Sequence, residues 1–214
     1  MTEHHLAVTR SARYYQSGPV SASTRHVWFV CHGYGQLAAY FARHFAFLPD
    51  ADPAAVVVAP EGLSRFYLNG NDGRVGASWM TRNDRLAEIA DHVAFLNQLA
   101  AQVLAGASPA VRITVLGFSQ GTATVGRWLV RAPFRPARLI LWAGGFPDDV
   151  DPDAARSLLA GLDLTLVVGA HDEYLSGPQV QAQLQQLRAL GGEPRLLPFE
   201  GRHELNAALL RQLA

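Results

Sequence analysis

The chain has 214 residues, of which 49% are hydrophobic and only 17% are charged. This composition indicates a compact protein with a buried core and excludes a long disordered chain. Lysine plus arginine and aspartate plus glutamate both total 18, so the formal net charge is zero. Because the basic residues form no block or stripe, binding to nucleic acid or to an anionic membrane is not expected.

The one cysteine of the chain, Cys31, has no partner for an internal disulfide, so folding requires no oxidising compartment. The first residues, MTEHHLAVTRSARYY, are polar and lack the apolar centre of a signal peptide. No apolar run approaches the roughly 18 residues of a membrane-spanning helix. We therefore expect a soluble cytoplasmic protein in which residues 1–214 form one domain.

Short apolar or β-branched segments alternate along the chain with segments of helical periodicity. Strands are expected at 26–32, 54–60, 112–118, 138–144, 164–170 and 193–199, with 12–18 as a candidate edge strand. Helices are expected at 36–48, 82–106, 120–132, 152–162, 178–192 and 203–214. The strands are almost continuously apolar, which is typical of a parallel sheet buried on both faces. We expect an α/β fold: a mostly parallel, doubly wound sheet of about six or seven strands with helices on both faces and no large lid domain.

The expected helix at 82–106 has the clearest apolar stripe. The stripe, spaced three and four residues apart, consists of Leu86, Ile89, Ala90, Val93, Leu96 and Leu99–Ala100. In contrast, the glycine-rich segment 61–84 has no clear periodicity and contains Phe66, Tyr67, Trp79 and Met80. Irregular segments of this length are often functional, so we expect residues 61–84 to close over a substrate.

The sequence GFSQG, residues 117–121, places Ser119 in the pattern G-x-S-x-G between an expected strand and an expected helix. This context is that of a nucleophile elbow, in which flanking glycines leave room for a serine on a strained turn. The helix that follows adds a positive dipole end near the developing oxyanion. The alternative is a glycine-rich turn with a purely structural serine.

A serine hydroxyl needs a base, and the base needs a group that orients it. Asp172 follows the expected strand 164–170, and His203 follows the last expected strand, so the chain order is serine, acid, histidine. That order is the one found in α/β-hydrolases. We expect Ser119, Asp172 and His203 to be catalytic. The rival acids are Glu173, Asp148 and Asp149, although the last two also suit a helix N-terminus.

The sequence FVCHGYGQ, residues 29–36, ends the first strong strand in H-G-x-G. In hydrolases of this type, the loop after that strand and the residue after the nucleophile each supply one oxyanion donor. The expected donors are the backbone N–H groups of Tyr34 and Gln120. His32 is expected to support this loop, and Cys31 to lie in the core.

The remaining histidines show no spacing typical of a metal site, and His171 beside the expected acid is interpreted as incidental. We therefore expect neither a metal nor a cofactor.

The segments CHGYGQ, GFSQGTA, WAGGFP, GAHDEYL and EGRHEL resemble the phospholipase/carboxylesterase group of α/β-hydrolases, which is related to the acyl-protein thioesterases. The resemblance extends from Val27 to Ala214. It implies esterase or thioesterase activity without a cofactor, the triad Ser119, Asp172 and His203, and the amide donors already named. Two places depart from the group: residues 61–80, and Thr122, where the group often has glycine or alanine.

Bulky residues after the strand ends, where open α/β sheets bind ligands, are the candidates for an acyl pocket. We expect the pocket to be lined by Trp79, Met80, Trp142, Phe146 and Leu175. Tyr34, Phe66, Tyr67 and Leu205 belong to the same aromatic and apolar group.

The sequence thus favours a serine carboxylesterase that hydrolyses short- to medium-chain carboxylic esters through an acyl-enzyme. Thioesterase, lysophospholipase and small-peptidase activities use the same machinery and remain alternatives. A non-catalytic binding module of the same fold would be expected to show a broken triad. A dienelactone-hydrolase-like enzyme would be expected to have cysteine in place of Ser119. The expected partner is a small-molecule ester or thioester.

Overall fold

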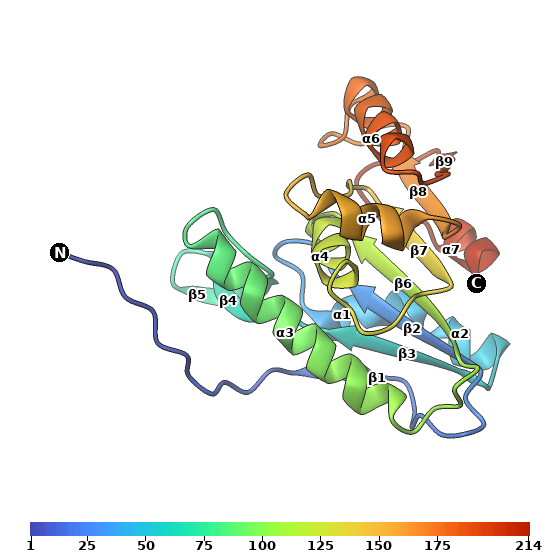
Figure 1. The fold of residues 1–214 in the computed structure, drawn as a ribbon, viewed down its shortest axis with the longest axis horizontal. Helices are drawn as coiled ribbons and strands as arrows, with labels where there is room; N and C mark the ends of the chain where they lie inside the picture. The colour runs from blue at the N-terminus through green and yellow to red at the C-terminus, as the bar shows by residue number, and fades with distance from the viewer.

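The computed structural model describes residues 1–214 and is built on one seven-stranded sheet with the strand order β1-β3-β2-β6-β7-β8-β9 (Figure 1). The strands of this sheet are β1 (Tyr14–Gln16), β2 (His26–Cys31), β3 (Ala55–Pro60), β6 (Arg112–Phe118), β7 (Arg138–Trp142), β8 (Asp163–Gly169) and β9 (Arg195–Phe199). Only β1 runs antiparallel to its neighbour β3, and all other pairs are parallel. The predicted α/β architecture, including the edge strand at the N-terminus, is confirmed.

Helices cover both faces of the sheet, as predicted. One face packs against α3 (Arg85–Leu104), α4 (Gln120–Leu129), α5 (Pro152–Leu159) and α6 (Gly177–Ala189). The other packs against α1 (Ala38–Phe41), the 3₁₀ helix η1 (Ala42–Phe45), α2 (Phe47–Ala51) and α7 (Ala207–Leu213).

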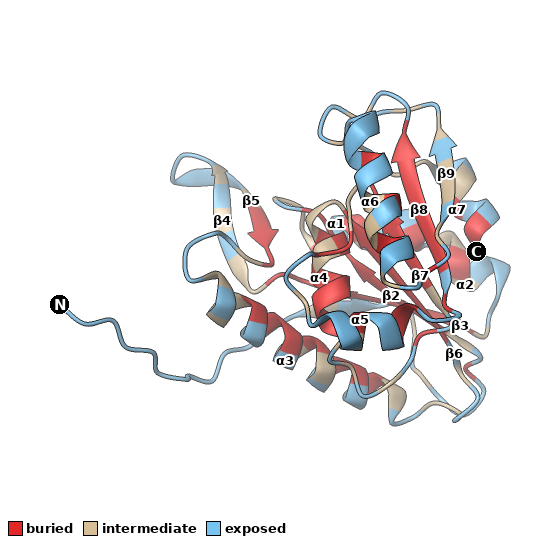
Figure 2. Ribbon diagram, turned by 45° about the horizontal axis from the view of Figure 1, so that its top comes forward, coloured by how far each residue is buried: buried red, intermediate tan, exposed pale blue.

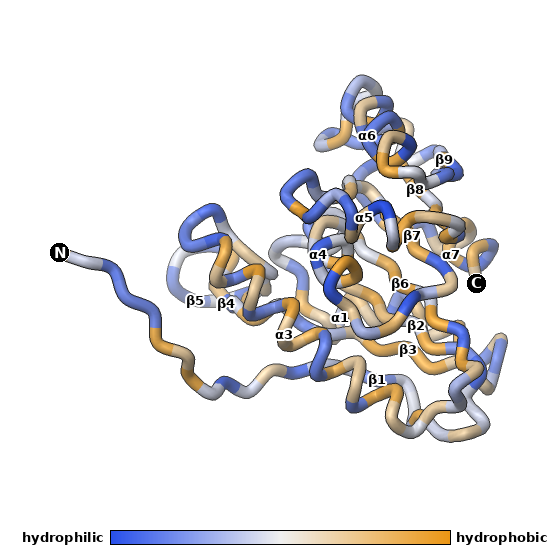
Figure 3. Tube along the Cα trace, in the orientation of Figure 1, coloured by the Kyte–Doolittle hydropathy of each residue, from blue (hydrophilic) through white to orange (hydrophobic).

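The two cores arise from the alternation of side chains along each strand. On β2, Phe29 packs in the core under α3 and α4, whereas Trp28 and Val30 pack in the core under α1 and α7. Each of these side chains is fully buried, which explains why the central strands are apolar at every position. Figure 2 shows the central strands buried along most of their length, and Figure 3 shows the matching apolar trace.

Residues 61–84 differ from the expected irregular segment. They form an antiparallel hairpin of β4 (Ser64–Asn69) and β5 (Asp72–Ser78), separate from the main sheet. An antiparallel bridge between Gln36 and Ala77 attaches the hairpin to the loop after β2. The hairpin is therefore a docked element, because its second strand is held by backbone hydrogen bonds.

Two expected helices are corrected by the structure. The expected helix 36–48 is broken into α1, η1 and α2, so its turns change from α to 3₁₀ and back. The expected helix 203–214 begins only at Ala207, because the Asn206 side chain accepts a hydrogen bond from the Leu209 N–H and caps it there.

The apolar stripe expected along 82–106 is correct except at its first turn and at Ala90. Ile89, Val93 and Leu96 are buried, but Leu86 is 72% exposed and Ala90 is also exposed. The first turn of α3 lies beside the hairpin rather than over the sheet (Figure 1), which explains the exposure of Leu86.

The N-terminal tail extends away from the sheet before β1 (Figure 1). Arg13, just ahead of β1, forms an ion pair with Glu61, whose side chain is 2% exposed, at an Nε to Oε1 distance of 2.5 Å. The same carboxylate accepts a hydrogen bond from the Ala38 N–H at the start of α1. No helix of the structure combines the length and the apolar character needed to cross a membrane.

Replacing Gly76 with alanine is expected to destabilise the protein by about 1–3 kcal/mol, because backbone atoms cannot yield to an added methyl group. A Cβ at Gly76 would lie 2.5 Å from the carbonyl oxygen of Gly35 and 2.7 Å from its Cα. The matched control is Gly177→Ala, where nothing lies within 4 Å of the added Cβ. Thermal unfolding would compare the two variants, and an equal Tm for both would contradict the close docking of the hairpin.

The free energy of unfolding is expected to fall as the pH falls from about 6.5 towards 4. Burial lowers the pKa of both His26 and His92 to about 4. Below pH 6.5 the unfolded chain therefore binds protons that the folded chain does not, and stability is fully present only above that pH. Allowing for the partial exposure of His26, the loss is on the order of 3 kcal/mol.

Urea unfolding at a series of pH values checks this expectation, with His92→Phe as the variant and the exposed His4→Gln as the control. The His92 ring contributes part of the dependence of the unfolding free energy on pH. His92→Phe should therefore make this dependence shallower, and His4→Gln should leave it unchanged. Identical slopes in the two variants would show that burial of His92 is not the cause.

Candidate active site

Ser119 lies in a strained turn between β6 and α4. Its backbone φ is 53° and ψ is −117°, in a region that side chains other than glycine rarely adopt. A Cβ at Gly117 would lie 2.4 Å from the Gly121 carbonyl oxygen, and one at Gly121 would lie 2.3 Å from that of Cys31. Both glycines are thus required by close backbone approach, as expected for a nucleophile elbow.

The structure brings Ser119, His203 and Asp172 into one hydrogen-bonded chain. The Ser119 Oγ lies 2.8 Å from His203 Nε2, and His203 Nδ1 lies 2.9 Å from Asp172 Oδ2. The side chain of Asp172 is fully buried and that of His203 is 15% exposed. His203 is held by the loop before α7, and Asp172 by the loop after β8.

The buried carboxylate of Asp172 is supported by its own loop. Asp172 Oδ1 accepts hydrogen bonds from the N–H groups of Tyr174, at 2.8 Å, and Leu175, at 3.1 Å. These bonds satisfy the carboxylate and fix its orientation toward the imidazole of His203.

The rival acids lie elsewhere. Glu173 and Asp148 are exposed. Asp149 is bound by Arg127, with Nε 3.0 Å from Oδ1, and its pair with Arg85 adds a second cation. The acid-rich segment before α5 acts as expected for a helix N-terminus, because Asp151 caps it by accepting a hydrogen bond from the Ala154 N–H.

The loop that contains Tyr34 is held on both sides of that residue. The Gly33 N–H donates to Gln36 Oε1 at 2.8 Å, and the Gly35 N–H donates to the Ala77 carbonyl at 2.9 Å. Between them, the Tyr34 N–H has no acceptor within the protein. Gln120 is the first residue of α4, so its N–H also lacks an intrahelical acceptor. Both N–H groups remain available to an external oxygen.

His32 supports this loop from below. Its ring is fully buried, and burial lowers its pKa, so the ring is neutral. Nδ1–H donates to the Gly33 carbonyl at 2.8 Å, and Nε2 accepts from the Gly62 N–H at 2.9 Å. The neighbouring Cys31 is fully buried too, and burial raises the pKa of its thiol, so it behaves as a core residue.

The side chain of Gln120 has a contact that the sequence did not reveal. Its Oε1 accepts from the Trp79 N–H at 3.1 Å, and its Nε2 donates to the Met80 carbonyl at 2.7 Å. It also exchanges a hydrogen bond with the Ser78 hydroxyl. The side-chain amide of Gln120, the residue after Ser119, is thus hydrogen-bonded to the end of the hairpin. Only the polar residue type at position 120 could have suggested this contact.

Three residues expected in the acyl pocket are corrected by the structure. Trp79 is 1% exposed, Trp142 0% and Phe146 2%, so these side chains belong to the cores. The indole N–H groups of the two tryptophans donate to the backbone carbonyls of His32 and Glu204, which fixes both rings inward. The Trp79 side chain is therefore not available to the expected lid, because it is buried in the core under α3 and α4.

Met80 and Leu175 are partly exposed, but both pack against the core under α3 and α4. Of the other candidates, Tyr34 and Tyr67 are exposed, and the Tyr34 ring packs tilted against Phe66 with ring centroids 5.1 Å apart. Tyr174, which the sequence analysis did not single out, packs edge to face with the imidazole of His203, with ring centroids 4.7 Å apart.

No protein-family model and no curated protein sequence matches this chain. Solved structures do match over nearly its whole length. The crystal structure of the esterase PE8 has 24% identity and a TM-score of 0.69, covering 96% of this chain and 100% of its own. The acyl-protein thioesterase 2 of Zea mays has 18% identity and a TM-score of 0.69, covering 95% and 96%. A carboxylesterase from Mesorhizobium loti has 25% identity and a TM-score of 0.66, covering 94% and 93%.

These likenesses confirm the α/β-hydrolase fold. They also agree with the predicted resemblance to the phospholipase/carboxylesterase group, because the matching structures include carboxylesterases and an acyl-protein thioesterase.

Replacing Gln120 with methionine, which preserves length but removes the amide, is expected to loosen the end of the hairpin. The Trp79 N–H loses its acceptor, so its hydrogen exchange should accelerate by about tenfold. Gln98→Met, at an exposed position on α3, is the control. Native-state hydrogen exchange measures both, and unchanged protection of Trp79 in Gln120→Met would mean that packing alone positions this segment.

Proposed function

We propose that this protein is a serine esterase that hydrolyses short- to medium-chain carboxylic esters. The observation that carries the proposal is the hydrogen-bonded chain from Asp172 through His203 to Ser119. It ends at a serine on a strained turn. The free backbone N–H groups of Tyr34 and Gln120 belong to the segments next to that serine.

In the proposed reaction, the Ser119 Oγ attacks the ester carbonyl while His203 Nε2 accepts the hydroxyl proton. Asp172 holds the imidazole in the tautomer with Nδ1 protonated and stabilises the imidazolium that forms. The Tyr34 and Gln120 N–H groups donate to the oxyanion. His203 then protonates the departing alcohol, and water hydrolyses the acyl-enzyme by the same steps in reverse order.

The comparisons support an ester-hydrolysing activity, since the similar structures are those of esterases and a thioesterase. The cavity beside the site, which has a volume of about 640 Å³ and is open to solvent, supports the proposed size class. A thioester would react by the same steps, and direct comparison of an ester with its thioester decides between them.

Ser119→Ala is expected to abolish hydrolysis of p-nitrophenyl butyrate, and Asp172→Asn to lower kcat by about 10³–10⁴-fold through the wrong imidazole tautomer. Initial rates on p-nitrophenyl esters of increasing acyl length measure both effects and locate the preferred chain. Ser11→Ala, on the exposed N-terminal segment, is the control for serine replacement.

Equal rates in the wild type and in Ser119→Ala would overturn the proposed role of the serine. A folded wild type without activity on any ester or thioester of the series would instead favour a binding module of this fold.

A further inference from the structure

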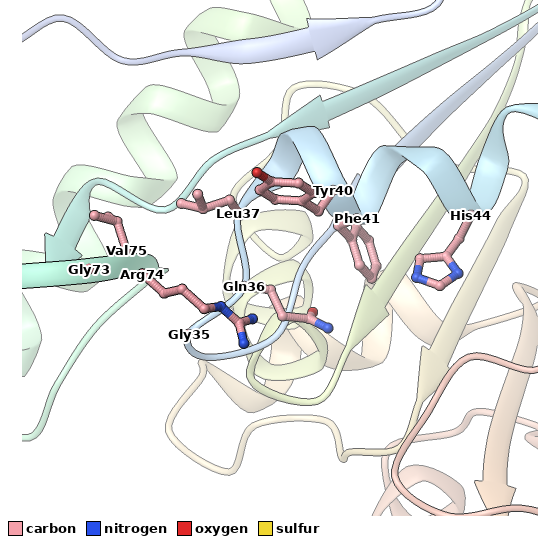
Figure 4. A pocket seen from close by; sticks show the side chains of 9 residues that line it. All are labelled: Gly35, Gln36, Leu37, Tyr40, Phe41, His44, Gly73, Arg74 and Val75. Carbon is pink, nitrogen blue, oxygen red and sulfur yellow. The ribbon is translucent and has the colours of Figure 1, made fainter. Parts of the chain in front are cut away.

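A cavity opens between the hairpin and the helix that follows the Tyr34 loop. It is lined by Gly35, Gln36, Leu37, Tyr40, Phe41, His44, Gly73, Arg74 and Val75 (Figure 4). None of these residues was expected from the sequence to contact a substrate. The lining comes from two segments, the loop before α1 together with the end of α1 and η1, and the beginning of β5, so it exists only because the hairpin is docked.

The cavity adjoins the reacting serine. Gly35 directly follows Tyr34, the proposed oxyanion donor. A Cβ built at Gly33 would lie 3.1 Å from the Ser119 Cβ and 3.2 Å from Gln36 Oε1, so the Gln36 amide lies next to the serine. The cavity therefore adjoins the loop beside the reaction centre, and a substituent of an ester bound at Ser119 can extend toward it.

The polar side chains of the cavity, Gln36, Tyr40, His44 and Arg74, can each donate a hydrogen bond, and no carboxylate is among its lining residues. Gln36 Oε1 is engaged by the Gly33 N–H, so the free end of this amide is its NH₂ group. Arg74 reaches toward the Gln36 loop (Figure 4), and the Tyr40 hydroxyl and the His44 ring belong to the same wall.

The guanidinium of Arg74 has no carboxylate partner. The arginine ion pairs of the structure are formed by Arg13, Arg85, Arg127, Arg138 and Arg156. A planar guanidinium with free N–H groups beside other donors is suited to a carboxylate, which it can bind with two parallel hydrogen bonds.

The position of His203 indicates which part of the ester enters the cavity. His203 must protonate the leaving alcohol, so the alcohol lies on the side of β8 and β9. The cavity lies on the opposite side of Ser119, next to the end of β2, since β2 lies on one side of β6 in the sheet while β7, and beyond it β8 and β9, lie on the other. The acyl chain is therefore the part that points into the cavity.

Resting on the proposed esterase function, we propose that the acyl pocket selects esters whose acyl chain ends in a carboxylate, that is, half-esters of dicarboxylic acids. Arg74 binds the terminal carboxylate, and the Gln36 NH₂ group assists it. Leu37 and Val75, which are partly exposed, contact the methylene groups between the carboxylate and the ester.

The test compares monoethyl adipate with ethyl 6-methylheptanoate, in which an uncharged isopropyl group replaces the carboxylate. Proton release at constant pH measures both reactions. Arg74→Gln should lower kcat/KM for monoethyl adipate by about fivefold to tenfold, mainly through KM, and change the uncharged ester by less than about twofold. Arg65→Gln, at an exposed position on β4 outside the cavity, is the matched control and should change neither.

Raising the salt concentration should reduce the preference of the wild type for the charged ester, because a partly exposed charge pair is screened. Equal effects of Arg74→Gln and Arg65→Gln, or a wild type that prefers the uncharged ester, would overturn the carboxylate site while leaving the esterase proposal intact.

Binding of the adipate dianion, measured by titration calorimetry, tests the site without any catalytic step. The wild type and Ser119→Ala should bind adipate with similar affinity, and Arg74→Gln should bind it about fivefold to tenfold more weakly. Unchanged affinity in Arg74→Gln would overturn the site even if no ester were hydrolysed. If the wild type hydrolysed no ester but still bound adipate more tightly than Arg74→Gln does, only the esterase proposal would be overturned.

Discussion

The close backbone approach at the end of β6 is the constraint on which the rest of the site depends. Ser119 keeps its strained angles only because Gly117 and Gly121 allow the strand, the elbow and the end of β2 to touch. That contact also places the loop after Cys31 against the serine. The N–H groups of Tyr34 and Gln120 are therefore positioned by sheet packing rather than by flexible loops.

The hairpin is held in place by residues on either side of the Ser119 elbow. Gly76 packs on the Gly35 backbone, and the Gln120 side chain holds the segment that contains Trp79 and Met80. The hairpin is thus attached to both sides of the elbow. It forms one wall of the cavity. The residues proposed to hydrolyse the ester are therefore positioned by the main sheet, whereas Arg74, proposed to select the acyl chain, is positioned by the docked hairpin.

The hairpin could have been expected in part, because Gly70–Asn71, the two residues that join β4 to β5, are a glycine-led pair typical of a hairpin turn. The glycines of β5 obscured the second strand. The expected acyl pocket failed for a different reason: position after a strand end says where a residue lies, but not which way its side chain points. Trp142 is the last residue of β7, and its side chain is turned inward, where its indole N–H donates to the Glu204 carbonyl.

The sequence by itself determined the alternation of strands and helices and singled out Ser119, Asp172 and His203, which the structure brings into one hydrogen-bonded chain. Each of these follows from residues close together in the chain, such as apolar runs, glycines flanking a serine, and polar residues just past a strand. The tertiary structure alone decided that Gln36 and Arg74 face one cavity. Their meeting depends on how a separate hairpin packs against a loop, and packing between distant segments leaves no local periodicity in the chain.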